Sequence, residues 1–220
     1  MEKLSEIYRY MGIKNQSEIS GVIKQRVSEL LCLAKELSDF KYVYKSFDLA
    51  FEKDSIAFGD AFFLKSNALM KNLKTCKKAF VFIATLGMEF EKKLQFFSAR
   101  QPSDALIFQA IGTELLEDFC DGLCNNTFLK DFPENYKTVP RFSPGYGDLS
   151  IDAQKDFFRI LKPEKAIGVY LTDSLMMIPS KSVSAIAGIS DCIYLKTKPA
   201  CTSCGKKDCE FRIKENGNEY

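Results

Sequence analysis

The feature that most constrains the fold is the segment Lys78–Thr85, with the sequence Lys-Ala-Phe-Val-Phe-Ile-Ala-Thr. Its apolar residues are continuous instead of alternating, which is typical of a strand that is buried on both faces. Such a strand needs neighbouring strands and further elements packed on both sides of the sheet. With 220 residues, 46% of them hydrophobic, the chain is long enough to supply this core in one domain.

Helices and strands are predicted around this run without the regular strand–helix–strand alternation of a parallel sheet. Apolar residues repeat with the helical period over residues 19–37, and over a longer helix that starts at Ser103 or Asp104 and extends to about Phe128. Aromatic and β-branched residues in 40–49 indicate a strand. The sequence therefore predicts an α+β fold with an antiparallel or mixed sheet and helices packed on it.

Serines are placed to begin three of the helices, because a serine hydroxyl can accept a hydrogen bond from a backbone N–H in the first turn. We expect Ser17 to cap the helix that ends near Asp39, Ser66 to cap a short helix, and Ser150 to cap a helix over 151–161. Further strands are predicted for residues 51–63, 167–171 and 182–189.

Composition excludes several classes of function. The 31 basic and 29 acidic residues are interspersed and give a net charge of +2, so nothing indicates a nucleic acid or a membrane as partner. The first residues lack the layout of a signal peptide, and no run of 18 apolar residues exists, so we expect a soluble, cytoplasmic protein. The absence of histidine excludes histidine-dependent triads and histidine-ligated zinc.

The eight cysteines form two groups. In an intracellular chain they indicate thiols or metal binding and not a framework of disulfides. Four of them are scattered among apolar residues and are expected to be unreactive core thiols: Cys32, Cys76, Cys120 and Cys124.

The other four cysteines are crowded near the C-terminus. Cys201, Cys204 and Cys209 have the spacing Cys-x2-Cys-x4-Cys, and Cys192 is the nearby candidate for a fourth ligand. Such a spacing can bring thiolates onto one cation, but zinc, an iron–sulfur cluster and free thiols all fit it. We expect residues 1–190, the N-terminal helices included, to form the main domain and 191–220 a cysteine-rich tail.

The segment Arg141–Asp148, with the sequence Arg-Phe-Ser-Pro-Gly-Tyr-Gly-Asp, is the strongest candidate for a ligand site. Glycine permits positive φ and proline fixes φ, so the backbone of this loop is restrained and can approach a ligand closely. Arg141 could clamp a carboxylate, and Tyr146 offers a surface for stacking. The alternative is an ordinary loop between two elements.

These residues also carry a resemblance to a known family. Together with the block Ile167–Ile189, which contains Pro-Ser-Lys-Ser-Val-Ser and Gly-Ile-Ser, the loop resembles the activation domain of cobalamin-dependent methionine synthase, in particular its short free-standing members. The resemblance extends to Ala84–Gly87, to the helix around 110–121 and to the terminal cysteines. It implies a C-shaped domain with a curved, mostly antiparallel sheet flanked by helices, and a shallow cleft for S-adenosylmethionine.

The resemblance also implies roles for single residues. It places Arg141 at the methionine carboxylate of the ligand, and Gly145 and Tyr146 complete the same motif. Ser143, Asp148 and Lys181 are assigned only because they lie in sequence blocks shared with the family. Tyr194 is assigned because it lies where the family has a tyrosine near the end of the domain.

The predicted helix before the loop is acidic, with Glu117 and Asp121 four residues apart. Solvated surface carboxylates are one explanation. The other, which the resemblance favours, is that one of them, Glu117, faces the cleft and pairs with its positive charge. Some larger family members carry a glutamate one turn after the position of Asp121, where this chain has Asn125.

The implied function is reactivation. When the methionine synthase cofactor is oxidised to cob(II)alamin, this domain presents S-adenosylmethionine, and an electron from a flavodoxin-type or ferredoxin-type donor allows methylcobalamin to form again. A chain without histidine lacks the usual axial ligand to cobalt, so the cobalamin must be held by another chain or module. Two alternatives remain: an activator of another corrinoid methyltransferase, and a non-catalytic, metal-stabilised interaction domain.

Overall fold

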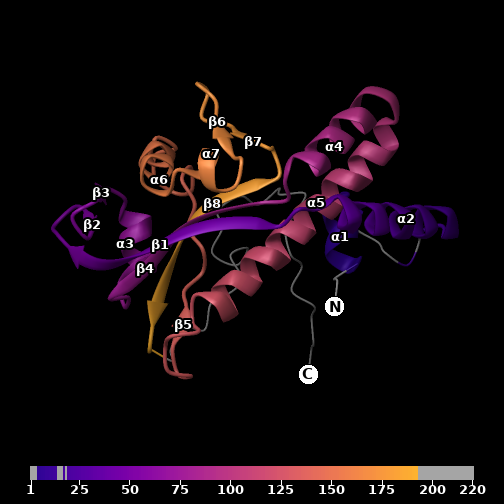
Figure 1. The fold of residues 1–220 in the computed structure, drawn as a ribbon. Helices are drawn as coiled ribbons and strands as arrows, with labels where there is room; N and C mark the ends of the chain where they lie inside the picture. Colours follow the sequence, from indigo (N-terminus) through magenta and orange to yellow (C-terminus); the bar gives the residue numbers. More distant parts are fainter. Residues whose placement is uncertain (1–3, 14–16, 18, 193–220) are drawn as a thin grey trace, which may run out of the picture.

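The computed structural model describes residues 4–13, 17 and 19–192 and has an α+β fold, as predicted (Figure 1). Six strands form one sheet in the order β3-β2-β1-β4-β8-β5, and every neighbouring pair is antiparallel. A separate pair, β6 and β7, forms a small hairpin. The strands are β1 (Lys41–Phe51), β2 (Ile56–Phe58), β3 (Phe62–Leu64), β4 (Lys78–Thr85), β5 (Lys137–Thr138), β6 (Tyr170–Leu171), β7 (Met177–Ile178) and β8 (Ser182–Ser190). The α-helices are α1 (Leu4–Tyr10), α2 (Gly21–Leu37), α3 (Asn67–Leu73), α4 (Met88–Arg100), α5 (Pro102–Gly122), α6 (Ala153–Leu161) and α7 (Pro163–Ala166).

Strand β4 has the central place that its continuous apolar sequence predicts. It pairs with β1 on one side and β8 on the other, over its whole length. Its residues from Ala79 to Thr85 are all buried. Strand β8 comes about a hundred residues after β4 in the chain. The periodicity of the sequence does not reveal that these two strands pair.

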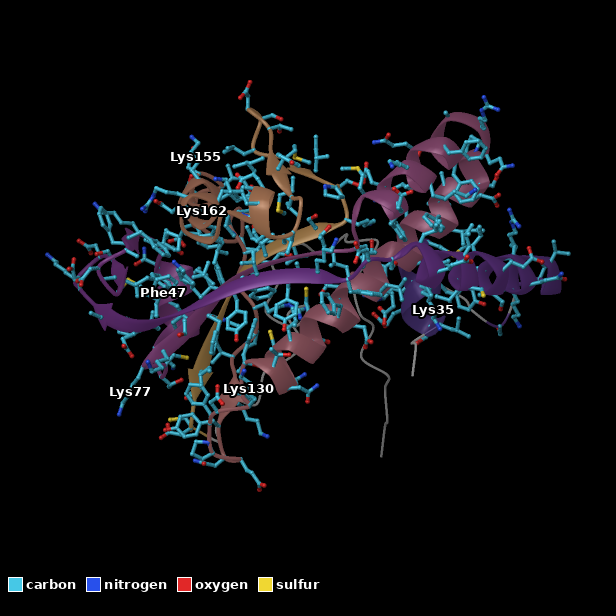
Figure 2. All side chains as sticks on the ribbon, viewed as in Figure 1. Lys35, Phe47, Lys77, Lys130, Lys155 and Lys162 are labelled. Atoms are coloured by element: carbon cyan, nitrogen blue, oxygen red, sulfur yellow. The ribbon has the colours of Figure 1, made fainter. Side chains whose placement is uncertain are left out.

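The two faces of the sheet bury separate hydrophobic cores. Phe80, Phe82 and Ala84 of β4 belong to the core with α1, α2, α4 and α5. Val81 and Ile83 belong to the other core, with α3 and α6. Figure 1 shows α5 along one side of the sheet and α6 on the other, and Figure 2 shows side chains filling both layers. A strand covered on both faces needs apolar residues at every position, which explains the lack of alternation.

Only one of the three predicted serine caps is confirmed. Ser66 begins α3, since its Oγ accepts a hydrogen bond of 3.0 Å from the N–H of Leu69. For α2 the prediction of Ser17 was wrong, because Ser20 is the cap. For α6, which begins at Ala153, Ser150 lies too early and accepts a hydrogen bond from the N–H of Asp152.

The long helix differs from its prediction in its first residue and in the form of its last turn, while its end near Phe128 is confirmed. It begins at Pro102 and not at Ser103 or Asp104, since proline has no N–H to satisfy and suits the first helical position. The α-helix ends at Gly122 and continues as a π-helical turn, Leu123–Thr127. Turns of this kind occur often at functional sites.

Three of the four predicted core thiols are buried, namely Cys76, Cys120 and Cys124. Burial raises the pKa of Cys120 to about 12 and that of Cys76 to about 11, so both remain thiols near neutral pH. The prediction for Cys32 was wrong, because this residue is exposed on α2. Among the residues that the structure describes, no helix combines the length and apolar character needed to cross a membrane.

Candidate ligand-binding site

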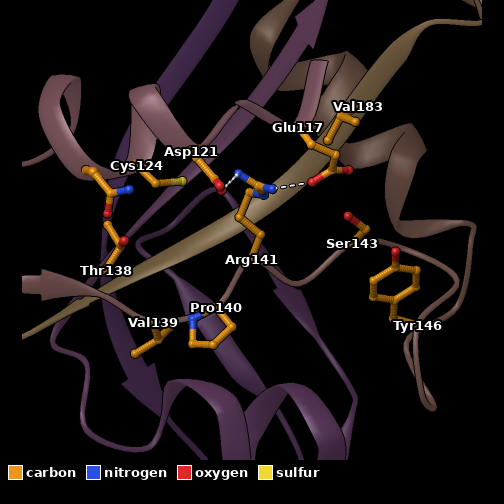
Figure 3. A pocket seen from close by; sticks show the side chains of 11 residues that line it. Glu117, Asp121, Cys124, Thr138, Val139, Pro140, Arg141, Ser143, Tyr146 and Val183 are labelled. Atoms are coloured by element: carbon orange, nitrogen blue, oxygen red, sulfur yellow. Dashed lines mark hydrogen bonds and ion pairs between the residues drawn. The ribbon is translucent and has the colours of Figure 1, made fainter. Parts of the chain in front are cut away.

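A hollow of about 410 Å³ lies where the end of α5, the loop after β5 and strand β8 meet (Figure 3). Four sections of the chain supply its walls: α5, the π-helical turn, the segment 138–146 and β8. The lining residues are Glu117, Asp121, Cys124, Asn125, Thr138, Val139, Pro140, Arg141, Ser143, Tyr146 and Val183. A larger hollow of about 940 Å³, beside β2, β3 and α6, contains none of the residues predicted to bind a ligand.

Arg141 is the positive centre of the hollow. Its guanidinium forms ion pairs with the carboxylates of Glu117 and Asp121, the latter at 2.6 Å, as Figure 3 shows. Burial lowers the pKa of Arg141, but the surrounding acidic groups, Glu117 first among them, act in the opposite direction, and the net effect is to raise it. A guanidinium carries five N–H groups, more than these two contacts use, so it can also bind a ligand.

The acidic side of α5 therefore faces the hollow, and Glu117 and Asp121 pair with Arg141 while remaining partly exposed to solvent. Glu117 and Asp121 are spaced four residues apart, so they lie on the same side of α5. Cys124 and Asn125 continue this side at the following turn and also line the hollow. Neither was predicted to contribute, although their spacing from Glu117 is the helical one and could have indicated it.

The loop Arg141–Asp148 supplies two further lining residues, Ser143 and Tyr146. Tyr146 is 62% exposed, so its ring is available to a ligand. Gly145 does not line the hollow; it has a φ of +89° and donates its N–H to the carbonyl of Leu149 at 2.9 Å. Its role in the structure is to close the turn that presents Tyr146.

Asp148 points away from the hollow and anchors the loop to α3. Its carboxylate accepts hydrogen bonds from the hydroxyl of Ser66 and from the N–H groups of Asn67 (2.8 Å) and Ala68 (3.1 Å). The bond from Ser66, together with the backbone N–H groups, lowers the pKa of Asp148 to about 2. Gly147 makes this contact possible, since a Cβ there would lie 2.9 Å from the Cβ of Ala68.

Lys181 also lies outside the hollow, directly before β8. The residue is only 7% exposed, and its Nζ donates to the hydroxyl of Thr113 at 2.7 Å. Thr113 is one turn before Glu117 on α5. Burial lowers the pKa of the Lys181 amine to about 8, although the charge of Glu91 acts in the opposite direction.

The family follows from comparison with known proteins. Residues 69–192, more than half of the chain, match the sequence model of the vitamin B12 dependent methionine synthase activation domain. The chain belongs to this family. The resemblance seen in the loop and in the block before Ile189 is therefore confirmed.

A structural comparison agrees with this assignment. The fold is similar to the crystal structure of a MetH reactivation domain bound to AdoHcy, with a TM-score of 0.58 and 19% identity. The similarity covers 78% of this chain but only 66% of the other, slightly less than two thirds of its length. At this identity the likeness shows the fold alone. A search of curated proteins gave no match.

The matched part of this activation-domain chain contains α5, the ligand loop and β8, and so every lining residue of the hollow. Of the residues predicted to bind the ligand, the fold brings together Glu117, Arg141, Ser143 and Tyr146. Gly145, Asp148 and Lys181 surround this group without lining the hollow. Helices α1 and α2 and strands β1 to β3 precede the match.

The remaining predictions concern the C-terminal segment. Tyr194, Cys201, Cys204 and Cys209 lie outside the described residues, so the metal site and the boundary at residue 190 stay predictions. Cys192 is described and is exposed just after β8. Within residues 4–13, 17 and 19–192, no group of three or more cysteine, aspartate or glutamate residues could hold a metal.

Proposed function

We propose that this chain binds S-adenosylmethionine in the hollow at Arg141 and presents its methyl group to a cobalamin held by another chain or domain. One electron from a flavodoxin-type or ferredoxin-type donor and this methyl group together convert cob(II)alamin to methylcobalamin and leave S-adenosylhomocysteine. The function is that of a reactivation component of methionine synthase. Membership in the activation-domain family and the AdoHcy bound to the similar structure support this proposal.

The observation that carries the proposal is the position of Arg141. Its guanidinium lies in a concave site between an acidic helix and a loop with an exposed tyrosine. We assign it to the carboxylate of the ligand, because a planar guanidinium matches a carboxylate in a bidentate geometry. The ammonium group of the ligand would approach Glu117 or Asp121, and the ring of Tyr146 would cover an apolar part.

The other predicted residues act on this site indirectly. Asp148 and Gly145 set the shape of the loop, and Lys181 bonds to Thr113 of α5, outside the hollow. The absence of histidine from the sequence supports a cobalamin held elsewhere, since the usual protein ligand to cobalt is missing.

A reactivation assay tests the proposal. The chain is mixed with a methionine synthase that lacks its own activation domain and carries cob(II)alamin, with S-adenosylmethionine and a low-potential reductant. We expect methylcobalamin to return faster than without the chain, as seen in the corrinoid absorption spectrum. Equal rates with the wild-type chain and with Arg141→Ala would contradict the proposal.

Two simpler measurements separate the alternatives. An interaction domain without a ligand would show no thermal shift with S-adenosylmethionine, whereas a ligand at 100 times its Kd stabilises a protein by about 2.7 kcal/mol. An activator of another corrinoid enzyme would bind S-adenosylmethionine but would reactivate only its own partner.

A further inference from the structure

We infer that the open edge of strand β1, residues Lys41–Phe47, is an interface with a second copy of this chain. The two copies pair as antiparallel strands about a twofold axis at Tyr44, and their sheets join into one. This interface is independent of the proposed function, because the lining of the hollow at Arg141 does not include these residues.

The first half of β1 has a neighbouring strand on one side only. Lys41–Asp48 pairs with β4, whereas β2 pairs with β1 only at Leu49–Phe51, and Figure 1 shows β2 and β3 at that end of β1. Among the described strands, none lies on the other side of Lys41–Phe47. All of its residues are exposed or half-buried. An open edge of this length is a template for a further strand.

Backbone groups of alternate residues point out from this edge. The carbonyl of Asp48 accepts a hydrogen bond of 2.9 Å from Gly59 on the β2 side, whereas the N–H of Leu49 donates to the carbonyl of Lys77, directly before β4, at 2.9 Å. In antiparallel strands both groups of one residue point to the same side, and the side alternates along the strand. The residues that direct both groups away from β4 are Tyr42, Tyr44 and Ser46. In the part of the chain that the structure describes, these groups have no backbone partner.

Tyr44 is the centre of the open edge, and a twofold axis there uses its whole length. Tyr44 then faces Tyr44 of the second copy, and Tyr42 faces Ser46, so each pair can exchange two hydrogen bonds. An axis between two residues is excluded, because an outward-pointing group would then face one that points to β4. A shift towards β2 is blocked at Gly59, which already bonds to Asp48.

The two lysines of the edge favour the same register. Lysine on an open edge usually opposes pairing, so the residue that each lysine faces is decisive. With the axis at Tyr44, Lys45 faces Val43. Lys41 faces Phe47, whose ring can accept a cation. An axis at Lys45 would place two lysines opposite each other, and so would an axis at Val43, which brings Lys41 opposite Lys45. Like charges directly opposite are destabilising, so charge and length select one register.

The aromatic side chains of β1 suit this register. The ring of Tyr44 packs on Phe80 and Phe128, with centroids 5.6 Å and 5.2 Å apart, so its position is fixed by the core. Tyr42 lies on the same side of the strand and is 38% exposed. Pairing at Tyr44 brings the two copies of this ring next to each other and covers apolar surface on both chains.

The association is expected to stop at two copies. A twofold interface uses the same edge of both chains and leaves neither edge free. The strands at the two ends of the sheet, β3 (Phe62–Leu64) and β5 (Lys137–Thr138), are too short to template a comparable pairing.

Sedimentation equilibrium of the full chain tests this interface. We compare loading concentrations of about 5 µM and about 500 µM, because an interface built on one strand is small and therefore weak. The variant is Ser46→Pro, at an exposed position where proline leaves the bonds to β4 intact but removes an N–H that points outward. Ser46→Ala is the matched control, since it keeps this N–H. Circular dichroism checks that each variant is folded.

We expect a concentration-dependent dimer for the wild type and for Ser46→Ala, with dissociation constants that agree within about twofold. Ser46→Pro should raise the dissociation constant at least about tenfold, because the twofold axis doubles the loss of one hydrogen bond. A wild-type chain that is monomeric at both concentrations would overturn the inference. So would a folded Ser46→Pro variant that dimerises like the wild type.

Hydrogen exchange of the wild-type chain gives an answer even if the proline variant does not fold. The amide groups of Tyr42, Tyr44 and Ser46 should exchange more slowly at the higher concentration, since pairing protects them. A dimer in which exchange over Lys41–Phe47 does not depend on concentration would place the interface elsewhere and contradict the inference. Neither measurement involves S-adenosylmethionine, so its outcome leaves the proposed function untouched.

Discussion

Arg141 and Lys181 are two cations placed against the same helix, α5, but their environments act on them in opposite directions. Arg141 faces two carboxylates, and its pKa is raised. Lys181 is more deeply buried, donates to the hydroxyl of Thr113, and has a pKa lowered to about 8. The comparison teaches that burial alone does not place a positively charged side chain where it can bind a ligand. Of these two cations, only Arg141 opens onto the hollow, whereas Lys181 is enclosed by its neighbours.

The largest expected effect is on Arg141. Arg141→Ala should weaken S-adenosylmethionine binding about ten- to a hundredfold, since hydrogen bonds to charged groups contribute about 1.5–3 kcal/mol. Arg141→Lys should recover little, because an ammonium does not match the two oxygens of a carboxylate. Calorimetry measures both affinities. Wild-type affinity in both variants would show that Arg141 is not the ligand's partner.

The second prediction concerns stability at Lys181. The folded-state pKa is about 8 and the ordinary value is 10.5, so between these values the unfolded chain binds more protons. The free energy of unfolding of the wild type should therefore rise relative to Lys181→Met as the pH increases, by about 2 kcal/mol between pH 7 and pH 10. Below about pH 8 the lysine is protonated in both states, and the difference should be constant.

Urea denaturation at a series of pH values measures this difference. Lys71→Met, which changes an exposed lysine on α3, is the control and should show no such trend relative to the wild type. If the free energies of unfolding of the Lys181 and Lys71 variants had the same pH dependence, burial of Lys181 would not affect the stability of the protein. S-adenosylmethionine affinity should change less than threefold in Lys181→Met, in contrast to Arg141→Ala.

The smallest expected effect is at Asp148, which positions the loop between Arg141 and α3. Asp148→Asn should lower the Tm at neutral pH and weaken S-adenosylmethionine binding only about threefold. The effect on binding is small because the substitution loosens the attachment of the loop to α3 and removes no direct contact with the ligand. The lowered pKa of Asp148 means that its stabilising contribution is present above about pH 4 and is lost as the pH falls towards 2. The Tm difference between variant and wild type should therefore shrink in that range. A larger loss of affinity than in Arg141→Ala would show that Asp148 contacts the ligand.

The sequence predicts well those structural features that depend on a local pattern of residues. The continuous apolar run gave the central strand β4, and Ser66 was recognised as the cap of α3. The helical spacing of Glu117 and Asp121 indicated that they share one side of α5, although not that Arg141 would lie between them. The loop motif pointed to Arg141 and Tyr146, and both residues line the hollow.

What the sequence did not predict depends on contacts between distant segments. Asp148 belongs to the motif, but its partners are on α3, about eighty residues earlier. Lys181 was expected at the ligand, and it is buried with its Nζ bonded to Thr113 of α5, which lies 68 residues earlier in the chain. The start of α6 differed from the prediction because Ser150 bonds to the backbone two residues later and not within a helical turn. Each of these outcomes was decided by a tertiary neighbour or by a competing local hydrogen bond.

The position of β8 has a consequence for how the protein is made. It is the last of the described strands to leave the ribosome, yet it lies inside the sheet, between β4 and β5. Until Ser182–Ser190 is available, one edge of β4 stays without its partner, and an unpaired strand edge invites pairing with other chains. The wall of the hollow at Val183 and the bridge between Phe142 and Ile186, which holds the loop Arg141–Asp148, also depend on this strand. Completion of the sheet and assembly of the hollow are therefore the same late event in the synthesis of this chain.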